Sequence, residues 1–328
     1  MVRSLKSTAV IVGLVLFSGV VLAQPRADLQ GYPARPIRII VPNTAGSAMD
    51  NVTRMIAQHL TEKWGQQIVV DDRPGAGGII GHELAARAAP DGYTLLFSAS
   101  AGVVIQPLMT KVSYDSGRDF TPISLVVTSI QILASHPSVA ANNVEELMAL
   151  ARAKPGQLNC GSSGSGGSNH LTCEMLKVMA GVNFQHVPFK GTVPQMIGVV
   201  SGQVQFAFAS IPTTLAFVKA GKLRALAQGG MTRSPVVPNL PTVAEIYPGF
   251  QAVTWYALFA PRGTPPAIVG RLNAEVVNIL ADPPTMRRLA DQGLDPQPTT
   301  PSELTTYMQS ETERFSRIIK SSGLATIQ

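Results

Sequence analysis

The sequence contains few of the residues from which catalytic and metal-binding sites are usually built. Only two of its 328 residues are cysteines, and its five histidines are dispersed, without the spacing of metal ligands. No serine lies in a G-x-S-x-G motif, and neither a G-x-x-x-x-G-K-[ST] phosphate loop nor a G-x-G-x-x-G dinucleotide fingerprint occurs. These absences disfavour serine hydrolases, nucleotide-binding proteins and metalloenzymes. We therefore expect no catalytic residue, no metal and no cofactor.

Apart from its first residues, the chain also lacks a long apolar run. Arg3 and Lys6 precede an apolar stretch over residues 9–22, which ends at Ala23 as a signal-peptidase site would. The stretch is shorter than the roughly 20 residues of a membrane-spanning helix, and no lipid-accepting cysteine follows it. We predict that residues 1–23 are a signal peptide rather than a membrane anchor. The mature protein is then expected to be periplasmic and not membrane-spanning.

Charged residues are sparse and show no strong local bias. Without Arg3 and Lys6, the 26 basic residues fall to 24, against 20 acidic residues, which leaves a net charge of +4. The basic residues form no run and do not alternate with aromatic residues, so we expect no binding to nucleic acid. A mild positive balance is compatible with an anionic ligand.

The two cysteines, Cys160 and Cys173, leave two possibilities open. Export would permit a disulfide between them. Cys160 ends a predicted strand and Cys173 lies in the helix after the next loop, so a bridge would staple that loop. Alternatively, both thiols are free and buried, because cysteine packs as a small apolar side chain.

Three loops of small residues each connect an apolar strand to the start of a helix. They cover residues 42–50 (PNTAGSAMD), 74–78 (PGAGG) and 161–169 (GSSGSGGSN). A helix that begins after small residues exposes N–H groups and the positive end of its dipole, and such a site binds anions without a charged side chain. Three loops of this kind predict a receptor for a small carboxylate.

Strands and helices alternate in two series, which predicts an α/β fold of parallel sheets with helices on both faces. The first series runs from a strand at 38–41 to a strand at 93–97, and the second from a helix capped by Asn143 to a strand at 223–227. Extended segments at 123–135 and 253–260 separate them, and a long helix at 302–320, closed by Gly323, ends the chain. We predict two lobes, lobe 1 from residues 24–125 and 254–328 and lobe 2 from residues 126–253, with crossovers near 124–127 and 251–254.

Several segments, in order along the chain, resemble one known family of receptors. They include YPARPIRIIVP (32–42), RPGAGGIIG (73–81), PDGYTLL (90–96), LNCGSSGSGGSNHL (158–171) and HVPFKGT (186–192). Over essentially the whole mature chain, the sequence resembles the tripartite tricarboxylate transporter receptor family, the Bug or TctC-type periplasmic solute-binding proteins. The resemblance implies a two-lobed type II periplasmic-binding-protein fold, with a mostly parallel sheet in each lobe, two hinge crossovers and the ligand in the cleft.

The resemblance also implies which loops hold the ligand. In such receptors the first strand–helix loop and the Gly/Ser loop of the second lobe grip carboxylates, largely through backbone N–H groups and ordered water. Carried over by position, the first grip consists of Asn43, Thr44, Ala45, Gly46, Ser47 and Asp50. The second grip consists of Ser163, Gly164, Ser165, Gly166, Gly167 and Ser168. The remaining residues expected at the ligand are Gly77, Gly78, Ser98, Ser100 and Ala209.

The sequence departs from the family pattern at places that bear on the ligand. The first loop usually reads P-F-P-A-G-G-G-x-D, whereas residues 42–50 here carry additional amide and hydroxyl groups that can donate hydrogen bonds. Cys160 stands where the family usually has tyrosine. Gln205 and Ala209 stand where the family often has aspartates. The loss of an acid near the cleft disfavours ligands that carry an ammonium group.

These observations predict a monomeric extracytoplasmic receptor for a small organic acid. We expect it to deliver the acid to the membrane subunits of a tripartite transporter or to a two-component sensor. Two alternatives stay open. One is a periplasmic enzyme that acts on a similar acid, and the other is a protein without a ligand that has a scaffold or signalling role, which the altered first loop allows.

Overall fold

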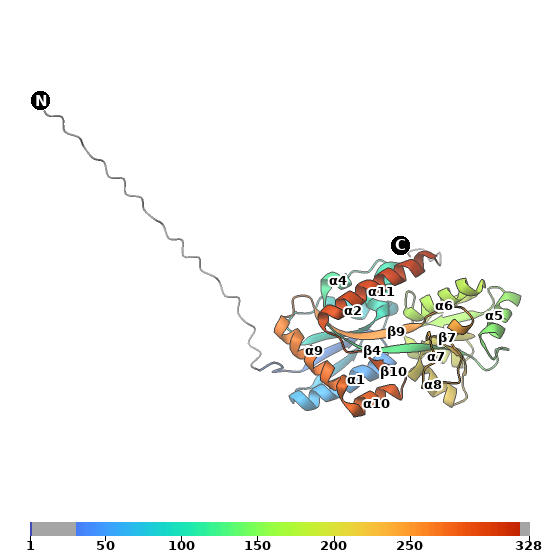
Figure 1. Ribbon diagram of the computed structural model, residues 1–328, viewed down its shortest axis with the longest axis horizontal. Helices are drawn as coiled ribbons and strands as arrows, with labels where there is room; N and C mark the ends of the chain where they lie inside the picture. Colours follow the sequence, from blue (N-terminus) through green and yellow to red (C-terminus); the bar gives the residue numbers. More distant parts are fainter. Residues whose placement is uncertain (2–30, 322–328) are drawn as a thin grey trace.

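The computed structural model describes Met1 and residues 31–321 (Figure 1). Two groups of helices and strands lie side by side along the long axis, and two long strands, β4 (Phe120–Ser135) and β9 (Val253–Pro261), run between them (Figure 1). The predicted signal peptide, apart from Met1, and the predicted helix terminator Gly323 lie outside the described residues.

The order of strands and helices follows the predicted alternation. The N-terminal segment contains β1 (Ile37–Val41), α1 (Ala48–Trp64), β2 (Ile68–Asp72), η1 (Ala76–Gly78), α2 (Ile79–Ala86), β3 (Thr94–Ala99), the π-helical turn η2 (Ala101–Ile105), α3 (Gln106–Met109) and α4 (Ser116–Asp119). The middle segment contains α5 (Val144–Ala153), β5 (Asn159–Ser162), α6 (Ser168–Ala180), β6 (Gln185–Pro188), α7 (Thr192–Val200), β7 (Phe206–Ser210), α8 (Ile211–Lys219), β8 (Arg224–Gln228) and η3 (Val243–Glu245). After β9 come α9 (Pro266–Ala281), α10 (Pro283–Ala290), β10 (Leu294–Pro296) and α11 (Pro301–Ser321).

Local hydrogen bonds define both ends of helix α1. Ser47 is its N-cap and accepts a hydrogen bond from the backbone N–H of Asp50. Gly65 ends it in the left-handed conformation, with φ of 66°, and donates its N–H to the carbonyl of Thr61. The first loop is therefore fixed to the start of this helix.

Two mixed sheets share the strand β4. In the first, β2, β1 and β3 are parallel and β9 joins them antiparallel to β3. In the second, β6, β5 and β7 are parallel. Strand β4 pairs antiparallel with β9 and β10 on one side of the molecule and with β7 and β8 on the other. The parallel strands carry the loops of small residues at their carboxyl ends, where ligands bind in α/β sheets.

The change of partner along β4 lies at Gln131. Ile130 still pairs with Val253 of β9, whereas Gln131 pairs with Ser210 of β7. This point is a few residues beyond the crossover expected near 124–127, because an apolar strand buried on both faces gives no sequence signal of where its neighbour changes. Gln131 also donates its backbone N–H to the carbonyl of Ala252, which immediately precedes β9. Ala252 lies within the second crossover, expected near 251–254.

Helices cover both faces of each sheet. In the first sheet, alternate residues of β1 point to opposite sides, so that Ile39 packs with α1 and α9 while Ile40 packs with α11. In the second sheet, Phe206 lies in the core with α5 and α6, and Ala207 lies in the core with α7. Each sheet therefore has its own pair of hydrophobic cores, one on each face. The ends of the strands are not covered by these helices and lie where the two sheets meet.

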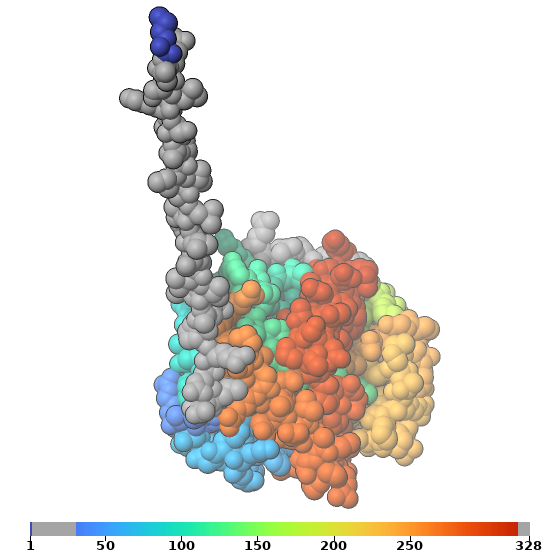
Figure 2. Space-filling view, turned by 60° about the vertical axis from the view of Figure 1, so that its left-hand side comes forward, coloured from blue at the N-terminus to red at the C-terminus, as the bar shows by residue number. Residues whose placement is uncertain are grey.

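The C-terminal helices pack back against the first sheet. Leu304 and Phe315 of α11 lie in one core with Ile40 and Leu96, and Trp255 of β9 donates its indole N–H to Glu311 at 3.0 Å. Figure 2 shows these helices, in orange and red, on one face of the molecule, beside the blue N-terminal residues and the yellow residues of the second sheet. Within residues 31–321, no helix has both the length and the apolar character needed to cross a bilayer.

Candidate functional site

A cavity of about 60 Å³ lies where the loops of the two sheets meet. Its wall combines residues at the ends of β1 and β3 with residues at the end of β7 and at the starts of α6 and α7. Strands β4 and β9 contribute Gln131, Thr254 and Tyr256. The lining residues are Pro42, Asn43, Met49, Gly77, His82, Ser98, Ala99, Ala101, Gly102, Gln131, Ser168, Asn169, Thr192, Ala209, Ser210, Thr254 and Tyr256.

The wall of this cavity carries no charge. Among the described residues that line it, none is Asp, Glu, Lys or Arg. Of the described lining residues, only His82 has a side chain whose usual pKa is near neutral. His82 is fully buried, and burial lowers its pKa to about 4, so its ring is neutral at pH 7. An anion in this cavity would therefore be held by uncharged donors and by helix dipoles.

Three helices of the second sheet begin at the cavity wall. Helix α6 begins at Ser168, α7 begins at Thr192, and α8 begins directly after Ser210. The N-caps of α6 and α7, Gly167 and Gly191, have no side chain, and Ser210 forms no capping bond to a described residue. Asn169 Oδ1 accepts the His170 N–H of α6, and Asn43 Oδ1 accepts the Thr192 N–H of α7. The positive ends of three dipoles thus face one small space, an arrangement that favours a negative charge there.

Of the six residues of the first loop that were predicted to contact the ligand, only one lies on the cavity wall. Asn43 lines the cavity, whereas the Asp50 carboxylate lies beneath the loop, where it accepts the Gly46 N–H at 2.7 Å and pairs with Arg54 at 2.7 Å. Ser47 caps α1, and the N–H of Thr44 is donated to Asn43. Asp50 thus shapes the loop and is paired with a cation. Thr44, Ala45, Gly46, Ser47 and Asp50 do not line the cavity.

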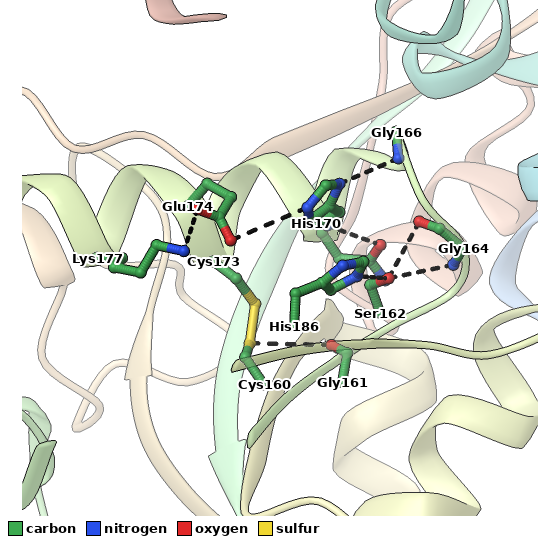
Figure 3. A network of polar contacts seen from close by, with 11 residues as sticks. Cys160, Gly161, Ser162, Gly164, Gly166, His170, Cys173, Glu174, Lys177 and His186 are labelled. Carbon is green, nitrogen blue, oxygen red and sulfur yellow. Dashed lines mark hydrogen bonds and ion pairs between the residues drawn. A yellow bond between two sulfur atoms is a disulfide. The ribbon is translucent and has the colours of Figure 1, made fainter. Parts of the chain in front are cut away.

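The Gly/Ser loop uses its own amides to hold its shape. Gly164 N–H donates to Ser162 Oγ, and Gly166 N–H donates to His170 Nδ1 at 3.0 Å (Figure 3). Gly167 N–H donates to the Gly164 carbonyl. The sequence predicts open donors here, but the partners of these N–H groups lie within the loop and the next helix. Of the predicted second grip, Ser168 lines the cavity, while Ser163, Gly164, Ser165, Gly166 and Gly167 do not.

A disulfide and a histidine pair support the base of this loop. Cys160 of β5 is bonded to Cys173 of α6, which resolves the open alternative in favour of the bridge (Figure 3). The ring of His186 stacks on that of His170 with centroids 3.7 Å apart, and His186 Nε2 lies 2.5 Å from Ser162 Oγ. The loop is therefore attached to the strand before it and to the helix after it.

The remaining predicted residues divide between the wall and its support. Gly77, Ser98 and Ala209 line the cavity. Gly78 lies behind it, and its carbonyl accepts a hydrogen bond from His82 Nδ1 at 2.8 Å, while His82 Nε2 lies 2.6 Å from Ser98 Oγ. Ser100 is fully buried, does not line the cavity, and its Oγ has no hydrogen-bond partner among the described residues.

Sequence reasoning missed several residues of the wall, chiefly His82, Gln131, Asn169, Thr192, Ser210, Thr254 and Tyr256. Thr192 and Ser210 could have been predicted from the sequence, because each lies between a strand and the start of a helix in the second series. His82 has no sequence signal, because it is one of five dispersed histidines. Gln131 and Thr254 lie within apolar strands that look like core, and only the tertiary fold brings them to the cavity.

The loops of the two sheets touch each other above the cavity. Asn43 Nδ2 donates to Thr192 Oγ1 at 3.2 Å, and the Thr192 N–H donates to Asn43 Oδ1 at 3.3 Å. Gln106 donates to the carbonyl of Ser165, and a methyl group at Gly164 would lie 2.8 Å from Gly77 Cα. The loops of the two sheets are therefore in direct contact, and glycines allow their backbones to approach.

Two buried histidines, His82 and His170, and the partly buried His186 predict a loss of stability in mild acid. Burial lowers the pKa of His82, His170 and His186 to about 4, whereas a histidine in the unfolded chain titrates near 6.5. Between these values the unfolded state binds more protons than the native state, so the free energy of unfolding decreases as the pH falls from about 6.5 to about 4. Urea denaturation at pH 7 and pH 5 measures this, and each fully buried histidine contributes up to about 1.4 kcal/mol per pH unit. Equal stability at both pH values would contradict the expectation.

Comparison with known proteins finds one family along most of the chain. The model of the "Tripartite tricarboxylate transporter family receptor" matches residues 52–324. Rpa4515 of R. palustris, solved with adipate, has a TM-score of 0.88 and 32% identity and covers 90% of this chain and 99% of its own. The periplasmic binding protein BugD has a TM-score of 0.85 and 32% identity over 90% and 99% of the two chains. MatC of Rhodopseudomonas palustris, with bound malate, has a TM-score of 0.83 and 32% identity over 88% and 99%.

Proposed function

Because this chain belongs to the tripartite tricarboxylate transporter receptor family, a family of periplasmic binding proteins, we propose that it captures a small organic carboxylate in the cavity between its two sheets. It then delivers the acid to the membrane subunits of a tripartite transporter or to a sensor protein. Residues 1–23 direct its export and are removed. The lobes, residues 24–125 with 254–328 and residues 126–253, close over the acid as a monomer.

The observation that carries this proposal is the absence of charge in a cavity faced by three helix N-termini. Among its described lining residues no side chain is anionic, and hydroxyl and amide groups from both sheets converge on it. Such a wall offers hydrogen-bond donors to a carboxylate without the ion pair that a lysine or arginine would supply. Asn43, Gly77, Ser98, Ser168 and Ala209 are then in contact with the ligand, and the other predicted residues shape the loops around it.

The size of the cavity supports a small aliphatic acid. One water molecule needs about 10–15 Å³ of such space, so 60 Å³ is room for about four to six waters. An acid of malate or adipate size, of the kind bound by two of the similar structures, matches this space when the lobes are closed. Large aromatic acids are expected to be excluded.

The absence of an acidic side chain supports selection against amino acids. An ammonium group placed in the cavity would lose its water and find no carboxylate among the described lining residues, which is costly for a buried charge. The family resemblance of the sequence leads to the same expectation, because it implies an aspartate where this chain has Ala209.

A thermal-shift panel tests the proposal. Mono-, di- and tricarboxylates are each mixed with the purified protein, with aspartate as a control that matches malate in skeleton but carries an ammonium group. An acid present at 100 times its Kd is expected to stabilise the folded state by about 2.7 kcal/mol, seen as a higher melting temperature. No shift with any acid would contradict the proposal, and turnover of an acid would favour the enzyme alternative.

A further inference from the structure

A buried carboxamide from the first sheet's side of the molecule forms its hydrogen bond with the Gly/Ser loop of the second sheet. Gln106 begins α3 and is 1% exposed, and its Nε2 atom donates to the backbone carbonyl of Ser165. A carbonyl oxygen only accepts hydrogen bonds, so this partner fixes the orientation of the carboxamide. Burying such a group is costly unless it is hydrogen-bonded, and this bond exists only while the two loops are in contact.

The carboxamide of Gln106 lies in a slot between one glycine from each of the two loops. A methyl group at Gly77, in the loop of the first sheet, would collide with Gln106 Nε2. A methyl group at Gly166, in the Gly/Ser loop, would lie 2.9 Å from both Nε2 and Oε1. Both glycines also have positive φ, 68° and 72°, which favours glycine at these positions. Glycine on each side therefore leaves room for one amide group and little more.

Hydrogen bonds and ring packing fix the backbone that carries Gln106. Its N–H donates to the carbonyl of Ala101 and closes the π-helical turn η2. Tyr114 donates its hydroxyl to the Gly102 carbonyl of this turn at 2.6 Å, and its ring stacks on that of His82 with centroids 5.1 Å apart. Turns of this kind are frequent at functional sites. Because Ala101 and Gly102 line the cavity, the turn connects the cavity wall to Gln106.

The contacts between the two loops lie at the rim of the cavity. Ser98, Ala209 and Tyr256 of its inner wall are buried. Asn43 and Thr192, which join the loops to each other, are only partly buried. An acid bound against the inner wall is therefore enclosed, and its entry and exit require the loops to separate.

We propose that Gln106 is a positioning residue that latches the two loops over the bound acid and determines how slowly the acid leaves. The inference rests on the proposed function, because it concerns release from the same cavity. Gln106 does not line the cavity, so it acts through the loops rather than by contact with the acid. Separation of the loops breaks its hydrogen bond to Ser165. Loss of this bond therefore speeds dissociation, and it does so equally for every acid that binds.

Stopped-flow kinetics with malate and with adipate test this inference. Gln106→Met keeps the approximate length of the side chain but removes the donor. It is expected to raise the dissociation rate constant of each acid about tenfold without slowing association, so that the ratio of the two affinities does not change. Gln106→Glu keeps the shape of the side chain but places a carboxylate against the Ser165 carbonyl. Because both groups are acceptors, it is expected to raise the dissociation rate further.

The matched control is Gln228→Met, which also removes a fully buried carboxamide. Gln228 Nε2 donates to the carbonyls of Val237 and Leu240, and its Oε1 accepts the N–H of Ser234. These partners all follow β8 in the second series, so none of these bonds joins the two loops. The control is expected to lower the free energy of unfolding and to leave the dissociation rate of the acids unchanged.

The outcomes distinguish this inference from the function on which it rests. If both Gln106 variants release the acids at the wild-type rate, the receptor function stands and the inference is overturned. An effect on only one of two acids that bind, or an equal acceleration in Gln228→Met, also overturns it. If the wild type binds neither malate, adipate nor any acid of the thermal-shift panel, the proposed function fails and the inference fails with it. Gln106→Glu, which has the shape of the wild-type side chain, decides if Gln106→Met does not fold.

Discussion

Replacing Gly77 with alanine is expected to weaken acid binding by about a hundredfold. Gly77 lies in the second loop with φ of 68°, directly against the Gly/Ser loop of the other sheet. A methyl group there would lie 2.2 Å from Gln106 Nε2 and 2.9 Å from the carbonyl oxygen of Ser165. The two loops could then not reach their present contact, and the acid would lose two or three hydrogen bonds from one side. A loss of about 3 kcal/mol corresponds to the expected factor.

The matched control for this variant is Gly65→Ala. Gly65 also has a left-handed backbone, with φ of 66°, but a methyl group there would meet nothing within 4 Å. Both variants have the same backbone strain of roughly 1–2 kcal/mol, and only Gly77→Ala obstructs the contact between the loops. Calorimetry measures the affinity, and X-ray scattering measures whether the acid still makes the protein more compact. Equal affinities in the two variants would show that the contact at Gly77 has no part in binding.

Loss of the Cys160–Cys173 bridge is expected to lower the free energy of unfolding by about 3 kcal/mol. The bridge closes a loop of about the length for which the chain-entropy model gives this value, since the cysteines are 13 residues apart. It also joins β5 to α6 at the base of the Gly/Ser loop, beside the stacked rings of His170 and His186. Urea denaturation with and without a thiol reductant measures the effect.

The double variant Cys160→Ser, Cys173→Ser provides the control for this experiment. The sequence contains only these two cysteines, so a reductant has one target in the protein. The double variant is expected to have the lower stability without reductant and to show no further change when reductant is added. A wild-type protein whose unfolding midpoint does not respond to the reductant would contradict a stabilising role for the bridge.

The strand–helix order was predictable because apolar strands and small-residue loops are local signals. The loops at 42–50, 74–78 and 161–169 do lie at the ends of parallel strands, and the two extended segments do become the long strands β4 and β9. The comparisons confirm the family and the fold that these patterns indicated. The division into lobes stays a prediction, although the point at which β4 changes its partner is now defined.

The details of the site depend on contacts that sequence patterns do not encode. A small-residue loop suggests open N–H groups, but in the first loop the Asp50 carboxylate takes the Gly46 N–H, and in the Gly/Ser loop His170 takes that of Gly166. Conversely, Gln131 lies in an apolar strand and looked like core. Whether a donor or acceptor is free is decided by the neighbours that folding brings to it, which is why sequence reasoning found the loops but not the whole wall.

The most direct test of this account is a crystal structure of the protein grown with malate. The account places the acid between the two sheets, with a carboxylate at the N-termini of α6 and α7 and no charged side chain in contact. An acid bound elsewhere, for example beside Arg262 at the groove that α11 forms with the start of β4, or a malate held by an arginine or lysine, would contradict it.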